Sequence, residues 1–107
     1  MSEQDTLQRI KSEIESNKVV LFMKGTADAP LCGFSAATVQ ILKATKYPFK
    51  TVDVITNPDI RQALPGYSNW PTFPQLFIGG QLVGGCDIVH ELRDSGELDK
   101  LLGEAFK

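Results

Sequence analysis

The hydrophobic and polar positions of this chain follow two repeat lengths, and each change of repeat marks the boundary of an expected element. Apolar residues every three or four positions are typical of a helix with one buried face, and a short apolar run is typical of a strand. These patterns predict helices at residues 5–17, 32–45, 57–66, 87–94 and 97–106. They predict strands at residues 18–24, 49–54, 75–78 and 81–84.

Polar residues mark where three of the helices are expected to begin. Asp5 is the expected cap of the first helix, with Gln8 at the capping-box position. Asn57 is the expected cap of the third helix, because Pro58 follows it and fits the first turn. Asp87 is the expected cap of the fourth helix.

The order of the elements defines a fold class. The strand, helix and strand over residues 18–54 require a right-handed crossover between parallel neighbours. The last two strands are joined by Gly79 and Gly80 and form a hairpin with a two-residue turn. We therefore expect an α/β protein with a thioredoxin-like fold, in which a four-stranded mixed sheet is flanked by helices on both faces. The residues expected on the buried face of the second helix are Phe34, Ala37, Ile41 and Leu42.

Composition narrows the class of protein. The chain has 107 residues, 42% of them hydrophobic and 22% charged, so residues 1–107 are expected to form one globular domain. A net charge of −2 and the lack of a basic stripe with interleaved aromatics argue against nucleic-acid binding. The longest apolar run, Val19 to Met23, is too short to cross a membrane. Two cysteines behind a polar N-terminus that is unlike an export signal point to a reducing compartment, and the cytoplasm is expected.

Cys32 stands where the second helix is expected to begin. Unpaired backbone N–H groups and the positive end of the helix dipole favour a thiolate there, and the thiolate is the form that attacks disulfides and binds metals. Lys24, just before the preceding loop, is expected to add a positive charge near the sulfur. The C-x-x-C spacing of redox proteins is half kept, because its second position holds Ser35. A mixed disulfide at Cys32 would need an outside thiol to resolve it; the alternative is a buried structural cysteine.

Five short blocks carry a resemblance to a known family. They are Lys24 to Thr26, Cys32 to Ser35, Asn57 to Arg61, Trp70 to Gln75 and Gly84 to Asp87. With these blocks in this order and spacing, nearly the whole chain resembles a monothiol glutaredoxin of the CGFS type. It is similar to the short, single-domain form that is typical of bacteria.

The resemblance implies a glutathione site. Glutathione would be the outside thiol, and Lys24 and Arg61 would bind its glycyl carboxylate. Phe73 would offer its backbone to the cysteinyl part in the manner of an added strand, with a cis peptide bond before Pro74. Either cation would otherwise be an ordinary solvated surface residue.

The resemblance also implies a role for the start of the fourth helix. Gly85, Cys86 and Asp87 would hold the γ-glutamyl end, whose carboxylate suits helix-opening N–H groups and whose ammonium suits Asp87. Asp87 would otherwise be a plain cap. Cys86 has two interpretations: it acts through its backbone N–H alone, or its thiol lies near enough to Cys32 for a reversible disulfide.

Two further residues have less specific expectations. Trp70, with Pro71, is expected to pack as a plug, to contact partner proteins, or both. His90, the one histidine, is expected at the surface or half-buried rather than as a ligand or a base. The sequence has no local group of several cysteines and histidines, so a zinc site within one chain is not expected.

The resemblance implies iron–sulfur chemistry that needs two copies of the chain. A [2Fe–2S] cluster takes four thiolate-type ligands, and each copy would supply Cys32 and the thiol of its bound glutathione. The implied function is storage and transfer of the [2Fe–2S] cluster in iron homeostasis. The implied partners are a second copy in a cluster-bridged homodimer, a BolA-like protein and apo iron–sulfur acceptor proteins.

Two other functions stay open. A glutathione-dependent thiol–disulfide oxidoreductase would use Cys32 as the nucleophile that removes glutathione from mixed disulfides, with Lys24 as its charge partner. Residues 26–30 resemble the extended loop of CGFS proteins, which is expected to leave this activity weak or absent. A redox-inert adaptor that binds proteins through Trp70 would leave the glutathione residues unexplained.

Overall fold

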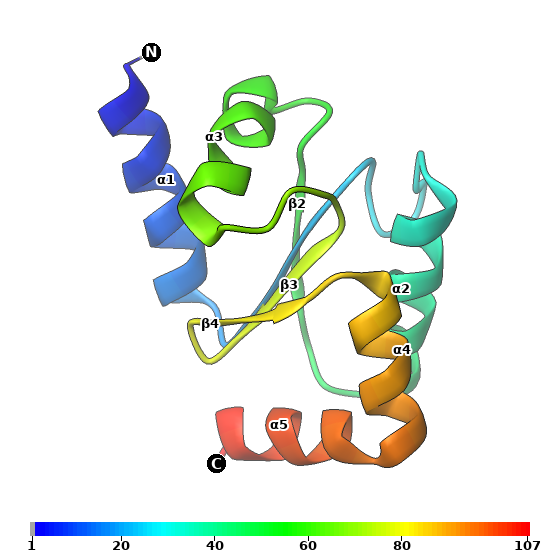
Figure 1. The fold of residues 1–107 in the computed structure, drawn as a ribbon. Helices are drawn as coiled ribbons and strands as arrows, with labels where there is room; N and C mark the ends of the chain where they lie inside the picture. The colour runs from blue at the N-terminus through cyan, green and yellow to red at the C-terminus, as the bar shows by residue number, and fades with distance from the viewer. Residues whose placement is uncertain (1) are drawn as a thin grey trace.

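The computed structural model describes residues 2–107 and contains a four-stranded sheet with helices on both faces (Figure 1). In chain order the elements are α1 (Glu3–Ser16), β1 (Val19–Met23), α2 (Gly33–Ala44), β2 (Lys50–Asp53), α3 (Pro58–Ser68), β3 (Gln75–Ile78), β4 (Gln81–Gly84), α4 (Cys86–Ser95) and α5 (Glu97–Ala105). The expected thioredoxin-like fold is confirmed by this element order and by the sheet.

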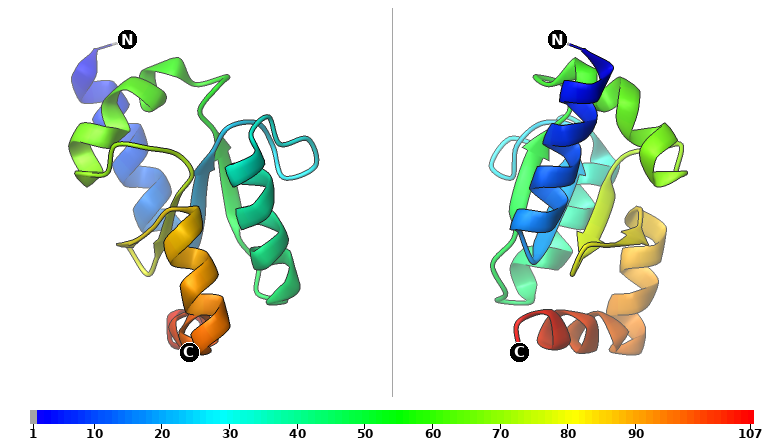
Figure 2. Two further views of the ribbon diagram at one scale, coloured as in Figure 1. Left: turned by 45° about the vertical axis from the view of Figure 1, so that its right-hand side comes forward. Right: turned by 90° about the vertical axis from the view of Figure 1, so that its left-hand side faces the viewer.

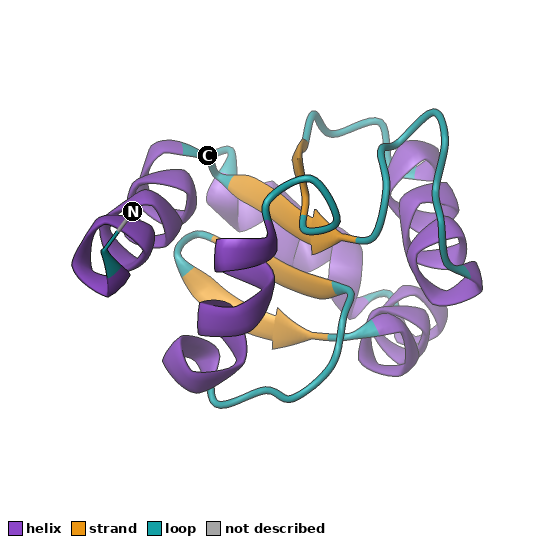
Figure 3. Ribbon diagram, turned by 90° about the horizontal axis from the view of Figure 1, so that it is seen from above, coloured by secondary structure: helices purple, strands orange, loops and turns teal. Residues whose placement is uncertain are grey.

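The sheet has the strand order β2-β1-β3-β4. β1 is parallel to β2 and antiparallel to β3, and β3 is antiparallel to β4. Gly79 and Gly80 have φ values of 60° and 82°, as the expected two-residue hairpin turn requires. Figure 3 shows the strands at the centre of the molecule with the helices around them. The central strands are therefore covered on both faces, which explains the unbroken apolar run of β1.

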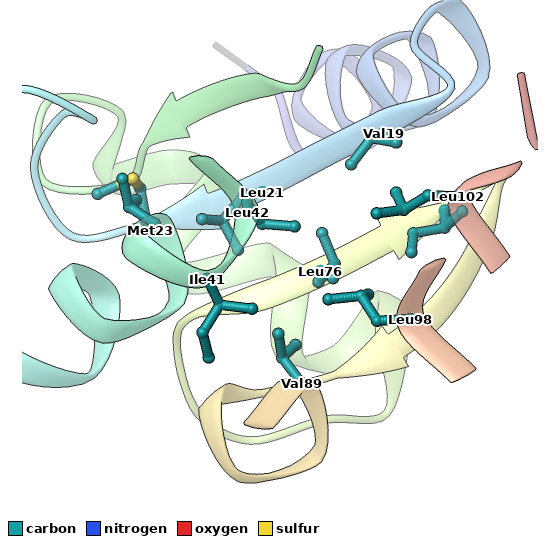
Figure 4. Packing of buried hydrophobic residues seen from close by; sticks show 11 residues of the cluster. Val19, Leu21, Met23, Ile41, Leu42, Leu76, Val89, Leu98 and Leu102 are labelled. Atoms are coloured by element: carbon teal, nitrogen blue, oxygen red, sulfur yellow. The ribbon is translucent and has the colours of Figure 1, made fainter. Parts of the chain in front are cut away.

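Alternate residues of β1 enter two separate hydrophobic cores. Val19, Leu21 and Met23 lie in one core, and Val20 and Phe22 lie in the other. The first core, shown in Figure 4, is completed by Val39, Ile41 and Leu42 of α2, Leu76 and Ile78 of β3, Val89 of α4, and Leu98 and Leu102 of α5. Ile10 and Ile14 of α1 and Ile60 and Leu64 of α3 complete most of the second. Figure 2 shows α1 and α3 together on one face of the sheet, with α2 and α4 on the other.

The caps of α1 and α4 differ from the expectation. Ser2 caps α1, because its hydroxyl accepts a hydrogen bond of 3.1 Å from the Asp5 N–H. Asp5 therefore lies in the first turn instead of capping it, and Gln8 lies one turn further on. Gly85 occupies the cap position of α4, so Asp87 is also inside the first turn. Both helices begin before the apolar repeat that their sequences show.

α3 continues past its expected end. Pro65 lies inside the helix, which ends at Ser68 with Asn69 in the left-handed conformation at φ 58°. A proline normally ends a helix because it lacks an N–H and crowds the carbonyl one turn earlier. Here the Ser68 hydroxyl donates to the carbonyl of Leu64, a fully buried core residue, at 3.0 Å. The turn that α3 adds after Pro65 is therefore accompanied by two contacts, the packing of Leu64 in the core and the hydrogen bond from Ser68 to Leu64.

The buried face of α2 is also rotated from the expected one. Ile41 and Leu42 are buried as expected, whereas Phe34 is 64% exposed and Ala37 is exposed. Ser35 and Thr38 take the buried positions, together with Val39. Burial of these two hydroxyls is possible because both are hydrogen-bonded: Ser35 accepts from Lys24 N, and Thr38 donates to Phe34 O.

Candidate functional site

A cavity of about 600 Å³ lies where β1 ends and where α2 and α4 begin. In Figure 1 this is the end of the sheet that bears the loop between β1 and α2, drawn in cyan. All six site residues expected from the sequence line the cavity, namely Lys24, Cys32, Arg61, Phe73, Cys86 and Asp87. They come from the end of β1, the starts of α2 and α4, the first turn of α3 and the loop before β3. The fold thus gathers distant parts of the chain around one thiol.

Cys32 occupies the cap position of α2 in extended conformation, with φ −152° and ψ 138°, and it is partly exposed. Its side chain makes no full capping hydrogen bond. The backbone N–H of Ser35 nevertheless faces the thiol and is the main cause that lowers the pKa of Cys32. Burial opposes this shift, while the Phe34 N–H and then the Lys24 charge lower the pKa further. The helix start therefore favours the thiolate more than the lysine does.

Ser35 stabilises the site from inside the protein. It is fully buried, and its hydroxyl accepts a hydrogen bond of 3.1 Å from the Lys24 N–H. The Lys24 carbonyl accepts a second bond, of 2.9 Å, from the Leu31 N–H. Both backbone groups of Lys24, its N–H and its carbonyl, are therefore hydrogen-bonded. Sequence reasoning considered Ser35 only as a missing second thiol, and no local pattern indicates this contact between two different elements.

The loop between β1 and α2 is closed on itself. Gly25 and Pro30 pair as an antiparallel bridge, and Thr26 and Ala29 exchange two backbone hydrogen bonds of 3.2 Å. Gly25 has φ 92°, and a Cβ atom there would lie 2.6 Å from the Ala29 carbonyl oxygen. Only glycine fits this position without displacement of the backbone.

Asp53, the last residue of β2, anchors this loop. Its carboxylate accepts hydrogen bonds from the N–H groups of Gly25 at 2.9 Å and Ile55 at 2.8 Å. Burial alone would raise the pKa of Asp53, but hydrogen bonds from Ile55, Gly25 and Thr56 together outweigh it and lower the pKa. The carboxylate therefore stays ionised while it holds the loop. This anchoring role was missed in the sequence, where Asp53 appears only as the end of a strand.

The charge of Lys24 gives a first testable prediction. Lys24→Gln is expected to raise the pKa of Cys32 modestly, because it removes one of the smaller causes of the lowered pKa and leaves the helix N–H groups in place. The thiolate fraction at a fixed neutral pH then falls. A pH titration of ultraviolet thiolate absorbance on a Cys86→Ser background measures the shift. Lys11→Gln, which removes a lysine paired with Glu15 on α1, is the charge-matched control. An unchanged titration of Lys24→Gln would contradict this assignment.

Arg61 reaches the cavity from α3, and the start of α3 is tied to two other elements. Arg9 of α1 donates to the Asp59 carboxylate and, at 2.8 Å, to the Asn57 side-chain oxygen. The Asn57 amide nitrogen donates to the carbonyl of Asp53 at 2.8 Å. The expected capping bond of Asn57 is therefore absent, because both ends of its side chain are used elsewhere. These bonds fix the helix that carries Arg61.

The loop before β3 forms another part of the cavity wall. The peptide bond between Phe73 and Pro74 is cis, as expected. Trp70 is partly buried, and its indole nitrogen lies 3.4 Å from the place that a Cβ atom on Gly85 would take. The Pro74 carbonyl oxygen lies 3.2 Å from the same point. Trp70 therefore packs against the start of α4, as the first of its two expected roles requires.

The start of α4 faces the cavity with Cys86 and Asp87. Cys86 is partly exposed and Asp87 is exposed, and both cysteines are free thiols that line the same cavity. The cap position of α4 holds Gly85, which offers no side chain to the first turn. The first N–H groups of α4 are therefore open to a ligand, and this arrangement suits an anion.

The surface around the thiol is apolar, and the histidine lies away from it. Leu31 and Phe34, on either side of Cys32, are 66% and 64% exposed. His90 is exposed on α4 as expected, with its ring nitrogens 3.3 Å from Asp94 and 2.9 Å from Arg93.

Residues 2–107 contain no group of three or more His, Cys, Asp or Glu side chains placed to hold a metal ion. In the same part of the chain, no helix is both long and apolar enough to span a membrane.

Comparisons of sequence with known proteins give consistent results. The family model described as Glutaredoxin matches residues 19–83, from β1 into β4. A probable monothiol glutaredoxin 2 from Rickettsia felis is 53% identical over 102 residues, which cover 95% of this chain and 98% of that protein. Glutaredoxin 4 from Escherichia coli K12 is 52% identical over 99 residues, which cover 92% of this chain and 86% of that protein.

Solved structures match the fold over almost the whole chain. Reduced apo GrxS14 from poplar is 50% identical with a TM-score of 0.79, and the match covers 96% of this chain and 92% of that one. The crystal structure of a buckwheat glutaredoxin–glutathione complex is 27% identical with a TM-score of 0.86, over the same shares of the two chains.

Proposed function

This chain belongs to the glutaredoxin family, as a monothiol member of the CGFS type, and from this membership we propose that it binds glutathione at Cys32 and carries a [2Fe–2S] cluster between two copies. The observation that carries the proposal is the cavity itself. It joins a thiol of lowered pKa to two cations, an exposed loop backbone and an uncapped helix start.

Glutathione fits this cavity by the chemistry of its two ends. Lys24 and Arg61 supply positive charge for the glycyl carboxylate, and the backbone of Phe73 supplies a hydrogen-bonding edge for the cysteinyl part. Cys86 and Asp87 receive the γ-glutamyl end, through the N–H groups that open α4 and through the Asp87 carboxylate. The similar buckwheat protein in complex with glutathione supports this choice of ligand.

The cluster is the cargo of this proposal, and one chain cannot hold it alone. A [2Fe–2S] cluster takes four thiolate-type ligands. Each copy contributes Cys32 and its bound glutathione, because Ser35 stands where a second protein thiol would be. The Cys32 thiol is partly exposed and its pKa is lowered, which favours the thiolate form that binds metals. Together with the glutathione thiol, it therefore suits the cluster. Ligands that are partly small molecules leave the cluster labile, as storage and transfer in iron homeostasis require.

The proposal extends to partners and place. The partners are a second copy in a cluster-bridged homodimer, a BolA-like protein that replaces one copy, and apo iron–sulfur proteins that receive the cluster. The working unit is residues 1–107 as one domain, acting in the cytoplasm. The net charge of −2 supports a function without nucleic acid.

A second candidate function is a glutathione-dependent thiol–disulfide oxidoreductase, which the lowered pKa of Cys32 favours. The Cys32 thiolate would attack the glutathione sulfur of a mixed disulfide and release the other thiol as a thiolate. A second glutathione thiolate would then attack the resulting Cys32–glutathione disulfide, which yields oxidised glutathione and restores Cys32. The closed loop at residues 25–30 lies directly before this thiol, and we expect weak or absent turnover in a glutathione-coupled assay.

Anaerobic reconstitution separates the two functions. The chain is incubated with iron, sulfide and glutathione, and its visible absorption and molecular mass in solution are measured. A chromophore that requires glutathione and elutes with a dimer is the expected result. A colourless monomer with rapid turnover of mixed disulfides would favour the oxidoreductase instead.

A further inference from the structure

Gln75 is a fully buried polar residue at the start of β3. It pairs with Phe22 of the central strand β1, so its backbone belongs to the interior of the sheet. A primary amide in such a place costs free energy unless its hydrogen bonds are made. The hydrogen bonds of the Gln75 amide therefore indicate the structural role of this residue.

The Gln75 side chain holds the loop that forms one wall of the cavity. Its amide nitrogen donates to the carbonyl oxygens of Trp70 at 2.9 Å and Thr72 at 3.2 Å. Within the described residues 2–107, the backbone of residues 71–73 makes no other intramolecular hydrogen bond. Among the described residues, this buried side chain therefore supplies the hydrogen bond that ties residues 71–73 to the sheet.

The same side chain is poorly placed to stabilise the fold. Its oxygen is buried and, among residues 2–107, has no hydrogen-bond partner. A buried polar atom without a partner is unfavourable, whereas an apolar side chain of similar volume has no such cost. The Thr72 carbonyl belongs to an exposed residue and can turn to water if the amide is removed. Gln75 therefore leaves one of its two polar atoms unpaired, so we expect it to stabilise the fold less than a fully hydrogen-bonded amide would.

We propose that Gln75 is a positioning residue, which holds residues 70–74 in the shape that presents the Phe73 backbone to the ligand. Phe73 lies directly after the Thr72 carbonyl that Gln75 binds, and its side chain is partly buried against the second core. The part of the proposal that concerns ligand affinity rests on glutathione binding, as proposed above. The part that concerns the loop stands on the two hydrogen bonds alone.

The substitution Gln75→Met tests the proposal, because methionine has a similar unbranched shape and cannot donate to the loop. Gln81→Met, at an exposed position of β4, is the matched control. We expect Gln75→Met to bind glutathione about tenfold more weakly by calorimetry, as the loss of an ordering hydrogen bond implies. We expect its thermal midpoint to stay within a few degrees of the wild-type value, roughly the effect of less than 1 kcal/mol.

Backbone relaxation measured by nuclear magnetic resonance gives a second readout that needs no ligand. Residues 71–73 are expected to gain fast motion in Gln75→Met and to keep wild-type order in Gln81→Met. If the wild-type chain fails to bind glutathione, the proposed function fails, and this readout still decides the positioning role. Unchanged order of residues 71–73, or unchanged affinity in a wild-type chain that binds, would overturn the proposal. So would unfolding of both Gln75→Met and Gln75→Leu, since the amide would then be required for folding.

Discussion

Replacing Cys32 with serine is expected to abolish the cluster chromophore completely after anaerobic reconstitution with iron, sulfide and glutathione. A serine hydroxyl does not ionise near neutral pH, so each copy loses the one protein thiolate that the proposal assigns to the cluster. Two glutathione thiols remain in a dimer, which is half of the ligands that the cluster takes. The measurement is the visible absorption of the reconstituted protein, together with its mass in solution.

The Cys32→Ser variant is informative because it is expected to fold. Cys32 occupies the cap position of α2, and serine is among the residues that stabilise that position best. Thermal unfolding should therefore match or exceed that of the wild-type chain, and the absorbance loss then reports on ligation alone. A Cys32→Ser protein that keeps the chromophore would eliminate the cluster proposal in its present form.

Cys86→Ser answers a different question in the same experiment. Both thiols are free and line one cavity. Retained absorption would show that the cluster does not need the Cys86 thiol, and lost absorption would add that thiol to the residues that the cluster needs.

The second large effect is expected from Gly25→Ala, in the loop before Cys32. The added Cβ would lie 2.6 Å from both the Ala29 carbonyl oxygen and the Leu31 nitrogen, and φ at this residue is 92°. Left-handed backbone costs a residue with a side chain about 1–2 kcal/mol. Displacement of Leu31 also breaks its hydrogen bond to the Lys24 carbonyl, at about 1 kcal/mol. A loss of roughly 3 kcal/mol lowers the thermal midpoint by about 10 °C or more.

Gly66→Ala is the matched control for this substitution. Gly66 lies inside α3, and a Cβ atom there meets nothing within 4 Å. Alanine in a helix interior is favoured over glycine by about 1 kcal/mol, so this variant should be slightly more stable than wild type. Equal midpoints for Gly25→Ala and Gly66→Ala would show that the loop can relax around a side chain, against the close contacts described above.

The sheet was predictable from the sequence because its signals are local. The unbroken apolar run before Lys24 identified a central strand, and the glycine pair at residues 79–80 identified a hairpin turn. The rotation of α2 was not predictable in the same way. Phe34 reads as a core residue by its apolar character, yet it lies beside the thiol, where the helix faces the opening of the cavity. At functional sites, apolar side chains can be exposed although they are usually buried.

The residues of the site were predictable only within the blocks that resemble the family. Apart from Pro65 and Ile88, the residues that line the cavity stand in the recognised blocks, so their convergence in the structure was expected. Ser35 and Gln75 also stand in these blocks and Asp53 does not, but the resemblance did not indicate that all three support the site through hydrogen bonds between distant elements. Pairings of this kind depend on the folded arrangement and have no spacing that a single sequence reveals. The cap position of Gly85 was not predicted for a simpler reason, because a glycine has no side chain that indicates the start of a helix.

The place of β1 in the sheet determines how the cavity opens. Its five residues are all buried, and it has a strand bonded on each side, so its amides should exchange with solvent only when the whole protein unfolds. Lys24 follows β1 directly, and its N–H donates to the buried hydroxyl of Ser35. Residues 70–74 form a loop that is held to the sheet by the two Gln75 hydrogen bonds, and we expect it to open at a lower free energy than the sheet. Any movement that widens the cavity is therefore expected in this loop, while the central strand stays in place.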